Sequence, residues 1–313
     1  MTTEPRQIFS AVESHSEGMR LDHWLAARFT YLSRNQWQNQ VKAGTVRVNN
    51  SEVRSSRILH AGDVVLFKPE NVVEPPVDFN YEITYEDEYF LVVNKGGNLP
   101  CHPAGAFFEN TLWRHMSSKF GKVYLANRLD RETSGLLLAA KTPKIANLLS
   151  AMFISGQIQK KYLALVYGIF EQEINAVGYL EPDKQSIVRK KRNFVSGETT
   201  LIPEESESAE TLFLPVKNNG QYSLVCAMPK TGRLHQIRAT LFSLGYPLLG
   251  DKLYGPDDTI YLRLSEGAIT AEDWQKLVMK RQALHAAELT LSHPVTKQII
   301  SFQAPLPDDF LQI

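Results

Sequence analysis

The sequence has little of what places a protein in a specialised class. Its 313 residues include only two cysteines, Cys101 and Cys226, which lie far apart and in no paired motif. This excludes a disulfide scaffold and a zinc ribbon, and it is typical of a reduced, cytoplasmic protein. The most apolar run, around residues 162–170, is too short to cross a bilayer, and no signal peptide is evident at the N-terminus. We therefore expect a cytoplasmic protein with no membrane partner.

Net charge and cofactor motifs are also missing. The 34 Lys and Arg residues balance 34 Asp and Glu residues, so any binding of nucleic acid must rest on local basic patches. Gly96 and Gly97 fit neither the dinucleotide-binding nor the P-loop spacing. His285, Glu288 and His293 fit neither the HExxH pattern nor a zinc knuckle. The sequence thus predicts no cofactor and no metal.

The chain is long enough for one or two domains, and its patterns divide it into two. We interpret residues 1–17 as a frayed leader or a short strand, and residues 18–69 as a compact α/β module. Residues 70–80 contain Pro75-Pro76 and little periodicity, which is typical of a linker. Residues 81–313 then form a larger domain.

Helix and strand signals alternate within the small module. The apolar residues from Leu21 to Phe29 share one helical face, and Ser33 is a typical N-cap for a second helix that ends at Gly44. Strands are predicted over Thr45–Val48, Val53–Ile58 and Val64–Phe67. Residues 18–69 carry eight Lys and Arg against three Asp and Glu, a net charge of +5. Taken alone, these patterns fit an RNA-binding module and a module with a solvated basic face equally well.

Several segments of this module resemble an S4-type RNA-binding domain, namely Gly18–Asp22, Ser33-Arg34, Gly44–Asn49 and Gly62-Asp63. The resemblance implies that the module binds RNA by its shape and its phosphate charge more than by base edges. It favours RNA contacts by four basic residues, Arg20, Arg34, Lys42 and Arg47.

The most informative stretch of the larger domain runs from Asn127 to Gly135. It places Asp130 between Arg128 and Arg131, ahead of an apolar run over residues 136–140 that predicts a buried strand. A nearby cation lowers the pKa of a carboxylate by roughly 1–3 units, so we expect the two arginines to keep Asp130 ionised, as a nucleophile requires. A surface turn with a structural ion pair is the alternative explanation of the same residues.

The segment from Arg128 to Thr142 resembles the signature of the RluA-type pseudouridine synthases. That resemblance implies an α+β fold, in which a mixed, largely antiparallel sheet is cleft by the active site, and it assigns catalysis to Asp130. The chain departs from the family pattern at two places. Asn127 stands where the family usually has histidine, and Gly96 stands where it commonly has proline.

Two further segments resemble motifs of the same family. Residues 160–168 read as a mostly buried strand, and the resemblance implies that Tyr162 stacks on the target base. Residues 230–238 begin a predicted helix whose apolar stripe is Leu234, Ile237, Leu241 and Leu244. Arg238 lies at the edge of this stripe, where a half-buried guanidinium needs an anion. The resemblance names Asp130 as that anion.

The sequence therefore predicts an RNA uridine isomerase that acts as a monomer on large-subunit ribosomal RNA, with transfer RNA as the second choice. Further RNA contacts are expected from Arg128, Arg131, Lys190, Lys191 and Arg233. Two alternatives stay open. One is a glycosidase-like hydrolase, which needs a second carboxylate about 5–9 Å from Asp130, with Glu132 as the near candidate. The other is a catalytically silent RNA-binding protein.

Overall fold

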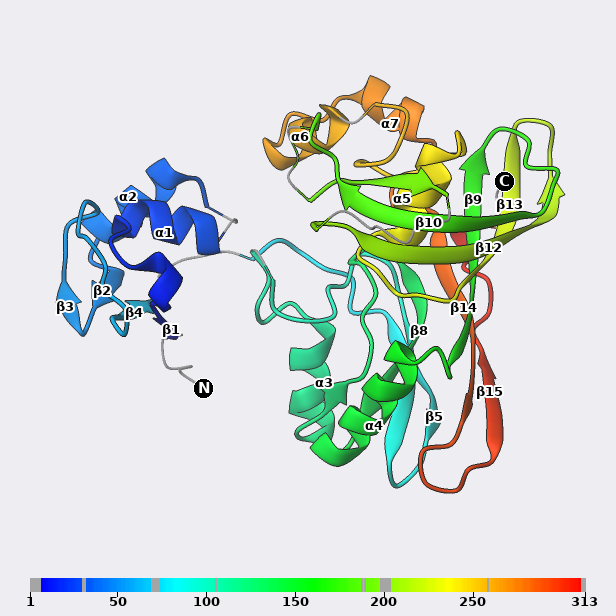
Figure 1. The fold of residues 1–313 in the computed structure, drawn as a ribbon, viewed down its shortest axis with the longest axis horizontal. Coiled ribbons are helices and arrows are strands. Elements are labelled where there is room, and N and C mark those ends of the chain that lie inside the picture. Colours follow the sequence, from blue (N-terminus) through cyan, green and yellow to red (C-terminus); the bar gives the residue numbers. More distant parts are fainter. Residues whose placement is uncertain are drawn as a thin grey trace. The chain divides into compact units, whose positions relative to one another are not determined.

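The computed structural model describes residues 7–29, 32–68, 74–104, 106–186, 188, 190–197, 204–257 and 259–310. Residues 1–6 of the predicted leader, 70–73 of the predicted linker and Arg189, the neighbour of Lys190, lie outside the described residues. The chain forms two compact units (Figure 1). The smaller unit comprises residues 1–76 and 103–110, and the larger comprises residues 77–102 and 111–313.

The smaller unit combines two helices with a small sheet. Its elements are β1 (Ile8–Ala11), a 3-10 turn (Ser14–Ser16), α1 (Leu21–Arg28), α2 (Arg34–Lys42), β2 (Val46–Val48), β3 (Ser51–Glu52) and β4 (Val64–Phe67). The strand order is β1-β4-β2-β3, so part of the predicted leader is a strand of this sheet. The core contains Leu21 and Leu25 from α1 and Trp37 from α2. Ser33 caps α2 through a capping box with Gln36, as expected for this N-terminus.

One strand predicted in this unit is wrong. Residues 53–58 do not continue β3. Their carbonyl groups instead bond the start of α1, because the amide of Leu21 donates to Arg57 O at 2.8 Å and that of Asp22 donates to Ser55 O at 3.0 Å. These long-range bonds satisfy the open N-terminus of a helix, a demand that local periodicity does not reveal.

The larger unit is built on one extended sheet. Its strands are β5 (Tyr81–Glu86), β6 (Phe90–Lys95), β7 (Tyr124–Leu125), β8 (Ser134–Ala140), β9 (Gln159–Tyr167), β10 (Ile174–Pro182), β11 (Arg192–Ser196), β12 (Glu207–Asn218), β13 (Tyr222–Pro229), β14 (Leu284–Ser292) and β15 (Ile299–Gln303). Within the described residues, eleven strands follow the order β11-β10-β12-β13-β9-β14-β8-β6-β5, with β15 on β14 and β7 on β8. Only the β14–β8 pair of this described sheet is parallel. The predicted mixed, largely antiparallel sheet is confirmed.

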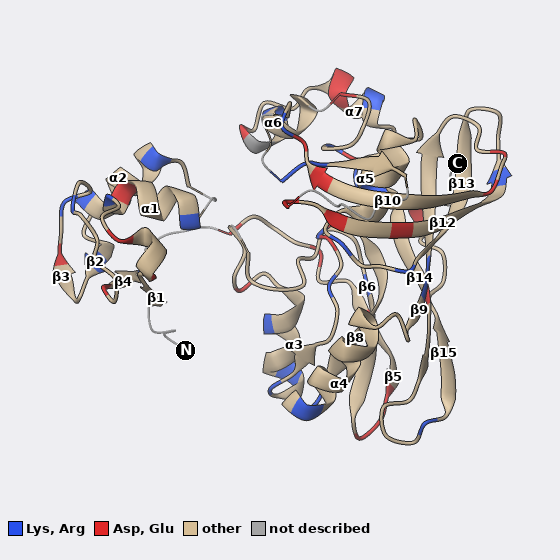
Figure 2. Cartoon of the chain, in the orientation of Figure 1, with Lys and Arg blue, Asp and Glu red and all other residues tan. Residues whose placement is uncertain are grey.

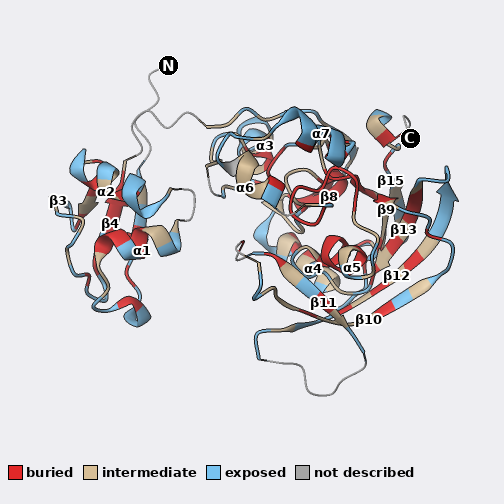
Figure 3. Ribbon diagram, turned by 90° about the horizontal axis from the view of Figure 1, so that it is seen from above, coloured by how far each residue is buried: buried red, intermediate tan, exposed pale blue. Residues whose placement is uncertain are grey.

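Five helices of this unit fall within the described residues: α3 (Leu112–Phe120), α4 (Pro143–Ile154), α5 (Gln236–Ser243), α6 (Thr259–Ser265) and α7 (Ala271–Leu277). Helix α4 begins with Pro143 in its first turn, a position that suits proline, and the Thr142 side chain is the cap. Every residue of β8 is buried, as Figure 3 shows. Figure 2 shows acidic and basic residues interspersed over both units.

A close backbone approach joins β8 to β14. Gly135 has φ +107, and a Cβ atom there would lie 2.2 Å from Ala286 O. Only glycine fits this position without a shift of the strands. The approach places the turn before β8, which carries Asp130, beside the start of β14.

Candidate active site

The turn that carries Asp130 is held by the loop that follows β6. The carbonyl of Arg131 accepts from Lys95 Nζ at 3.1 Å and from the Leu99 amide at 3.0 Å, while the Leu129 amide donates to Cys101 Sγ at 3.3 Å. The Lys95 side chain is fully buried, and this burial lowers its pKa to about 8. A bonded, buried support of this kind fixes the backbone on either side of Asp130.

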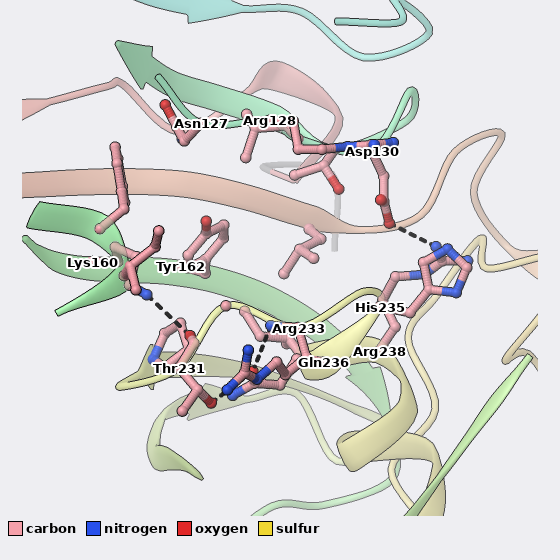
Figure 4. Close-up of a pocket in the computed structure, with 18 of the residues that line it drawn as sticks. Asn127, Arg128, Asp130, Lys160, Tyr162, Thr231, Arg233, His235, Gln236 and Arg238 are labelled. Carbon is pink, nitrogen blue, oxygen red and sulfur yellow. Dashed lines mark hydrogen bonds and ion pairs between the residues drawn. The ribbon is translucent and has the colours of Figure 1, made fainter. Parts of the chain in front are cut away.

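Asp130 meets Arg238 directly. Arg238 Nη1 donates to Asp130 Oδ2 at 2.7 Å, so the contact predicted between these two residues is present (Figure 4). Asp130 Oδ2 also accepts from Gln282 Nε2 at 3.4 Å. Among the described residues, Asp130 Oδ1 has no hydrogen-bond partner. One carboxylate oxygen is therefore anchored and the other is available to a ligand.

A second carboxylate shares Arg238. Arg238 Nε and Nη2 donate to Asp251 Oδ2 and Oδ1 at 2.7 and 2.9 Å, and Asp251 is fully buried. Asp251 also accepts from the amides of Leu253 and Tyr254. The guanidinium is thus clamped bidentately from behind, which leaves Nη1 to face Asp130. Asp251 was not predicted from the sequence.

Arg238 also decides the charge of Asp130. Burial raises the pKa of this carboxyl group, but the positive charge of Arg238 outweighs burial, and the pKa falls to about 2. Asp130 is therefore ionised at neutral pH. Of the three cations considered from the sequence, Arg238 has this effect. Arg128 is exposed with no side-chain partner in the described chain, and Arg131 pairs with Glu132 at 3.2 Å.

Asp130 and Arg238 open onto a cavity of about 430 Å³. That volume suits a small ligand or a single extruded nucleotide base. Its wall includes Tyr162 from β9, which is partly buried and whose hydroxyl has no partner among the described residues, as well as Lys160, Arg233 and His235. In Figure 4, Tyr162 is drawn between Asn127 and Arg128 on one side and Arg233 and Gln236 on the other.

The polar residues on the α5 side of the cavity are held by a tight turn. Gln236 Oε1 accepts from the Arg233 amide at 2.9 Å and from Thr231 Oγ1 at 2.8 Å. Lys160 Nζ donates to Thr231 O at 3.0 Å, and burial lowers the pKa of Lys160 to about 8. The sequence motif contained Lys160, but the reasoning gave it no role.

The turn also corrects the predicted start of the helix. α5 begins at Gln236, and Leu234 precedes it with 40% of its surface exposed, outside the apolar stripe. The side-chain bonds of Gln236 fold residues 231–235 into the turn, so the helical period that placed Leu234 beside Ile237 does not extend that far back.

The remaining basic residues predicted to bind RNA lie in varied settings. Arg20 and Arg34 both pair with the fully buried Asp22, at 3.1 and 2.9 Å, and Arg47 pairs with Glu52 at 3.1 Å. Lys42 is exposed and has no partner within the described chain. Lys190 lies 4.6 Å from the ring of Tyr261, and Lys191 is buried with its Nζ atom 3.8 Å from Asp183.

Glu132, the second carboxylate required by a hydrolase, points elsewhere. Its Oε2 atom accepts from Lys252 Nζ at 2.7 Å and from the Gln282 amide at 3.0 Å. Asp130 is the only carboxylate among the described residues that line the cavity. In the part of the chain that the structure describes, no cluster of His, Cys, Asp and Glu has the arrangement of a metal site. None of the described helices has the length and hydrophobicity to span a membrane.

Comparison with known proteins agrees with this geometry. The sequence profile described as RNA pseudouridylate synthase matches residues 89–243, and that of the S4 domain matches residues 19–65. The chain is 31% identical to the uncharacterized RNA pseudouridine synthase YlyB of Bacillus subtilis, over 98% of this chain and 97% of that protein. It is 32% identical to the ribosomal large subunit pseudouridine synthase D of Zymomonas mobilis, over 93% and 92% of the two chains.

The fold is also similar to that of a solved pseudouridylate synthase structure. The structure of human RNA pseudouridylate synthase domain containing 1 aligns with a TM-score of 0.55 at 22% identity, covering 76% of this chain and 86% of that one. Full-length similarity to pseudouridine synthases, together with the S4 match, shows that the chain belongs to the RluA-type family of RNA pseudouridine synthases.

Proposed function

We propose that this enzyme isomerises specific uridines of large-subunit ribosomal RNA to pseudouridine, with the carboxylate of Asp130 as the attacking group. The observation that carries the proposal is the cavity in which one oxygen of an ionised Asp130 is anchored by Arg238 and the other has no partner in the described chain. The choice of RNA is supported by relatives that are named for the large ribosomal subunit. The proposal places a monomeric enzyme in the cytoplasm.

The reaction needs one ionised carboxylate beside the sugar and no redox step. The free oxygen of Asp130 either bonds to C1′ as the N1–C1′ bond breaks, or takes a proton from C2′ while a C1′–C2′ double bond forms. In both routes the electron pair of the N1–C1′ bond leaves with the uracil. The ring then turns and C5 bonds to C1′. In the first route the Asp130–C1′ bond breaks as this bond forms, and in the second route the carboxyl group of Asp130 returns its proton to C2′. C5 then loses its proton to solvent and N1 takes one up, so the atoms of the uridine are conserved.

The target nucleotide must leave its helix or loop to reach this cavity, which costs a few kcal/mol. Stacking on Tyr162 returns about 1–3 kcal/mol by analogy with other base–aromatic contacts. Arg128 is exposed at the rim of the cavity without a side-chain partner in the described chain, which suits it to fill the gap that the extruded base leaves in the RNA.

Asp130→Asn tests the proposal. The variant keeps the size of the side chain but removes the negative charge, so we expect release of tritium from RNA labelled at uracil C5 to be lost while RNA binding is nearly unchanged. Free uracil in the assay would indicate a hydrolase, and binding without tritium release by the wild-type protein would indicate a silent RNA-binding protein. An Asp130→Asn variant that remains active would refute the assignment.

The substrate is tested separately. Pseudouridines are mapped in ribosomal and transfer RNA from cells with and without the protein. We expect the difference at one or a few positions of large-subunit ribosomal RNA, and a difference confined to transfer RNA would contradict the proposed substrate.

A further inference from the structure

His235 adopts a backbone conformation that its side chain makes costly. Its φ and ψ are 58° and 17°, in the left-handed region, at the N-cap of α5, and its side chain makes no capping bond. A non-glycine residue in this region is strained, and such strain collects at functional sites. The conformation turns the imidazole toward the cavity, which it lines beside the Asp130–Arg238 ion pair (Figure 4).

The imidazole is fixed by a two-step hydrogen-bond relay. His235 Nδ1 lies 3.0 Å from the hydroxyl of Tyr254, and this hydroxyl accepts from the Arg192 amide at 2.8 Å. Tyr254 is fully buried, and among the described residues its hydroxyl proton has no acceptor other than His235 Nδ1. Because a buried hydroxyl proton without an acceptor is costly, Tyr254 donates to His235 Nδ1. The ring proton of neutral His235 is therefore on Nε2.

The surroundings keep His235 neutral. Burial lowers its pKa, the charges of Arg238 and Lys190 lower it further, and the carboxylates of Asp130 and Asp251 oppose them, with a result of about 4. Nε2 has no partner within the described chain. At neutral pH the site thus contains an uncharged N–H donor on a ring that lines the cavity, and this donor has no hydrogen-bond partner in the described chain.

We propose that His235 is a catalytic residue whose Nε2–H group donates a hydrogen bond to a carbonyl oxygen of the target uracil, and that Tyr254 is the positioning residue that sets its tautomer. The proposal rests on the function proposed above. Asp130 must reach the sugar beside N1, and the C2 carbonyl is the uracil oxygen next to N1. A donor beside Asp130 therefore meets this oxygen first.

The donor acts where negative charge develops. When the N1–C1′ bond breaks, its electron pair spreads from N1 onto the C2 oxygen, and the hydrogen bond from Nε2 stabilises that charge. A neutral imidazole does this without giving up its proton, so no proton needs to be returned. A half turn of the ring about its N3–C6 axis exchanges N1 with C5 and the C2 carbonyl with the C4 carbonyl. The Nε2–H group of His235 can therefore donate to a carbonyl oxygen of the uracil both before and after the rotation.

His235→Gly is the first test. Glycine relieves the left-handed strain, but it also removes the acceptor of the buried Tyr254 hydroxyl, so these two effects oppose each other and we expect little change in melting temperature. The substitution also removes the Nε2–H donor. The single-turnover rate at saturating RNA should fall about 10²-fold or more, the loss typical of one oxyanion donor, with little change in RNA affinity. Lys297→Gly is the matched control, because Lys297 also has a positive φ of 64° but is exposed and absent from the cavity lining. It should keep the wild-type rate.

The second test reads the tautomer directly. Long-range ¹H–¹⁵N NMR spectra of the full chain should show His235 neutral with its proton on Nε2 at pH 7, and Tyr254→Phe should give a mixture of tautomers and a partial loss of rate. A proton on Nδ1, or an unchanged rate in His235→Gly, overturns the proposal. Asp130→Asn serves in parallel: if it is inactive while His235→Gly is fully active, only the role of His235 fails, whereas an active Asp130→Asn variant defeats the proposed function itself.

Discussion

A single guanidinium determines the electrostatics of the site. Arg238 is buried with 7% of its surface exposed, and burial alone would lower its pKa. The carboxylates of Asp251 and Asp130 raise it instead, so the cation is secure, and it in turn keeps Asp130 ionised. The two carboxylates differ in their contacts: Asp251 binds the guanidinium with both oxygens, whereas Asp130 binds it with Oδ2 alone and its Oδ1 has no partner in the described chain.

Asp251→Asn tests whether Asp251 is needed to hold Arg238. The amide keeps the shape and the oxygen that accepts from Leu253 and Tyr254, but it removes the anion behind Arg238. Removing one partner of a buried pair costs about 3–5 kcal/mol, so we expect a clear fall in melting temperature and in the rate of tritium release. Asp257→Asn is the control, since its pair with Arg263 is more exposed and should contribute much less to stability. Equal stability of the two variants would contradict the role of Asp251.

At the scale of helices and strands, local signals predicted the elements better than their ends. Apolar runs and caps were sufficient for β8 and for the start of α2, because burial and capping are properties of neighbouring residues. They failed for residues 53–58 and for the start of α5, where contacts with distant backbone or a side-chain turn override the local period.

The residues of the site likewise fall into those that the sequence predicted and those that it did not. Motif resemblance located Asp130, Tyr162 and Arg238, and the structure brings all three to one cavity. Asp251 and the relay from Tyr254 to His235 were not predicted, because they depend on which segments pack behind α5. Their chemistry is visible only when the acceptor of each buried donor is known.

Asn127, one of the two departures from the family pattern, joins the segment that precedes Asp130 to the middle of β8. Its Oδ1 atom accepts from the Leu138 amide at 2.9 Å, in the fully buried core of β8. Asn127→Ala should leave this amide unsatisfied and lower the free energy of unfolding by about 1–3 kcal/mol, measured by denaturant titration. Asn127→Asp keeps an acceptor oxygen and should lose less. If alanine is the milder of the two replacements, the hydrogen bond from the Leu138 amide to Asn127 does not stabilise the fold.

For the whole molecule, zero net charge means that attraction to RNA depends on where cations are placed. In the S4 domain, Arg20 and Arg34 pair with the buried Asp22 of α1. Each of these arginines therefore stabilises the helices, in addition to any contact that it makes with a phosphate. Lys42 is exposed at the end of α2 and pairs with no carboxylate in the described chain. The same positive charge is therefore structural at one position and free for RNA at the other.

Two alanine variants expose this difference. Lys42→Ala should keep the melting temperature and reduce the slope of log affinity against log salt by about 1, the loss of one phosphate contact. Arg34→Ala removes one of the cations that pair with the buried Asp22 and should lower the melting temperature as well as the affinity. Fluorescence titrations with a ribosomal RNA fragment over a range of salt concentrations, beside thermal unfolding, measure both. If Lys42→Ala leaves the slope unchanged, RNA does not contact this end of α2, and the affinity of the S4 domain must come from other cations.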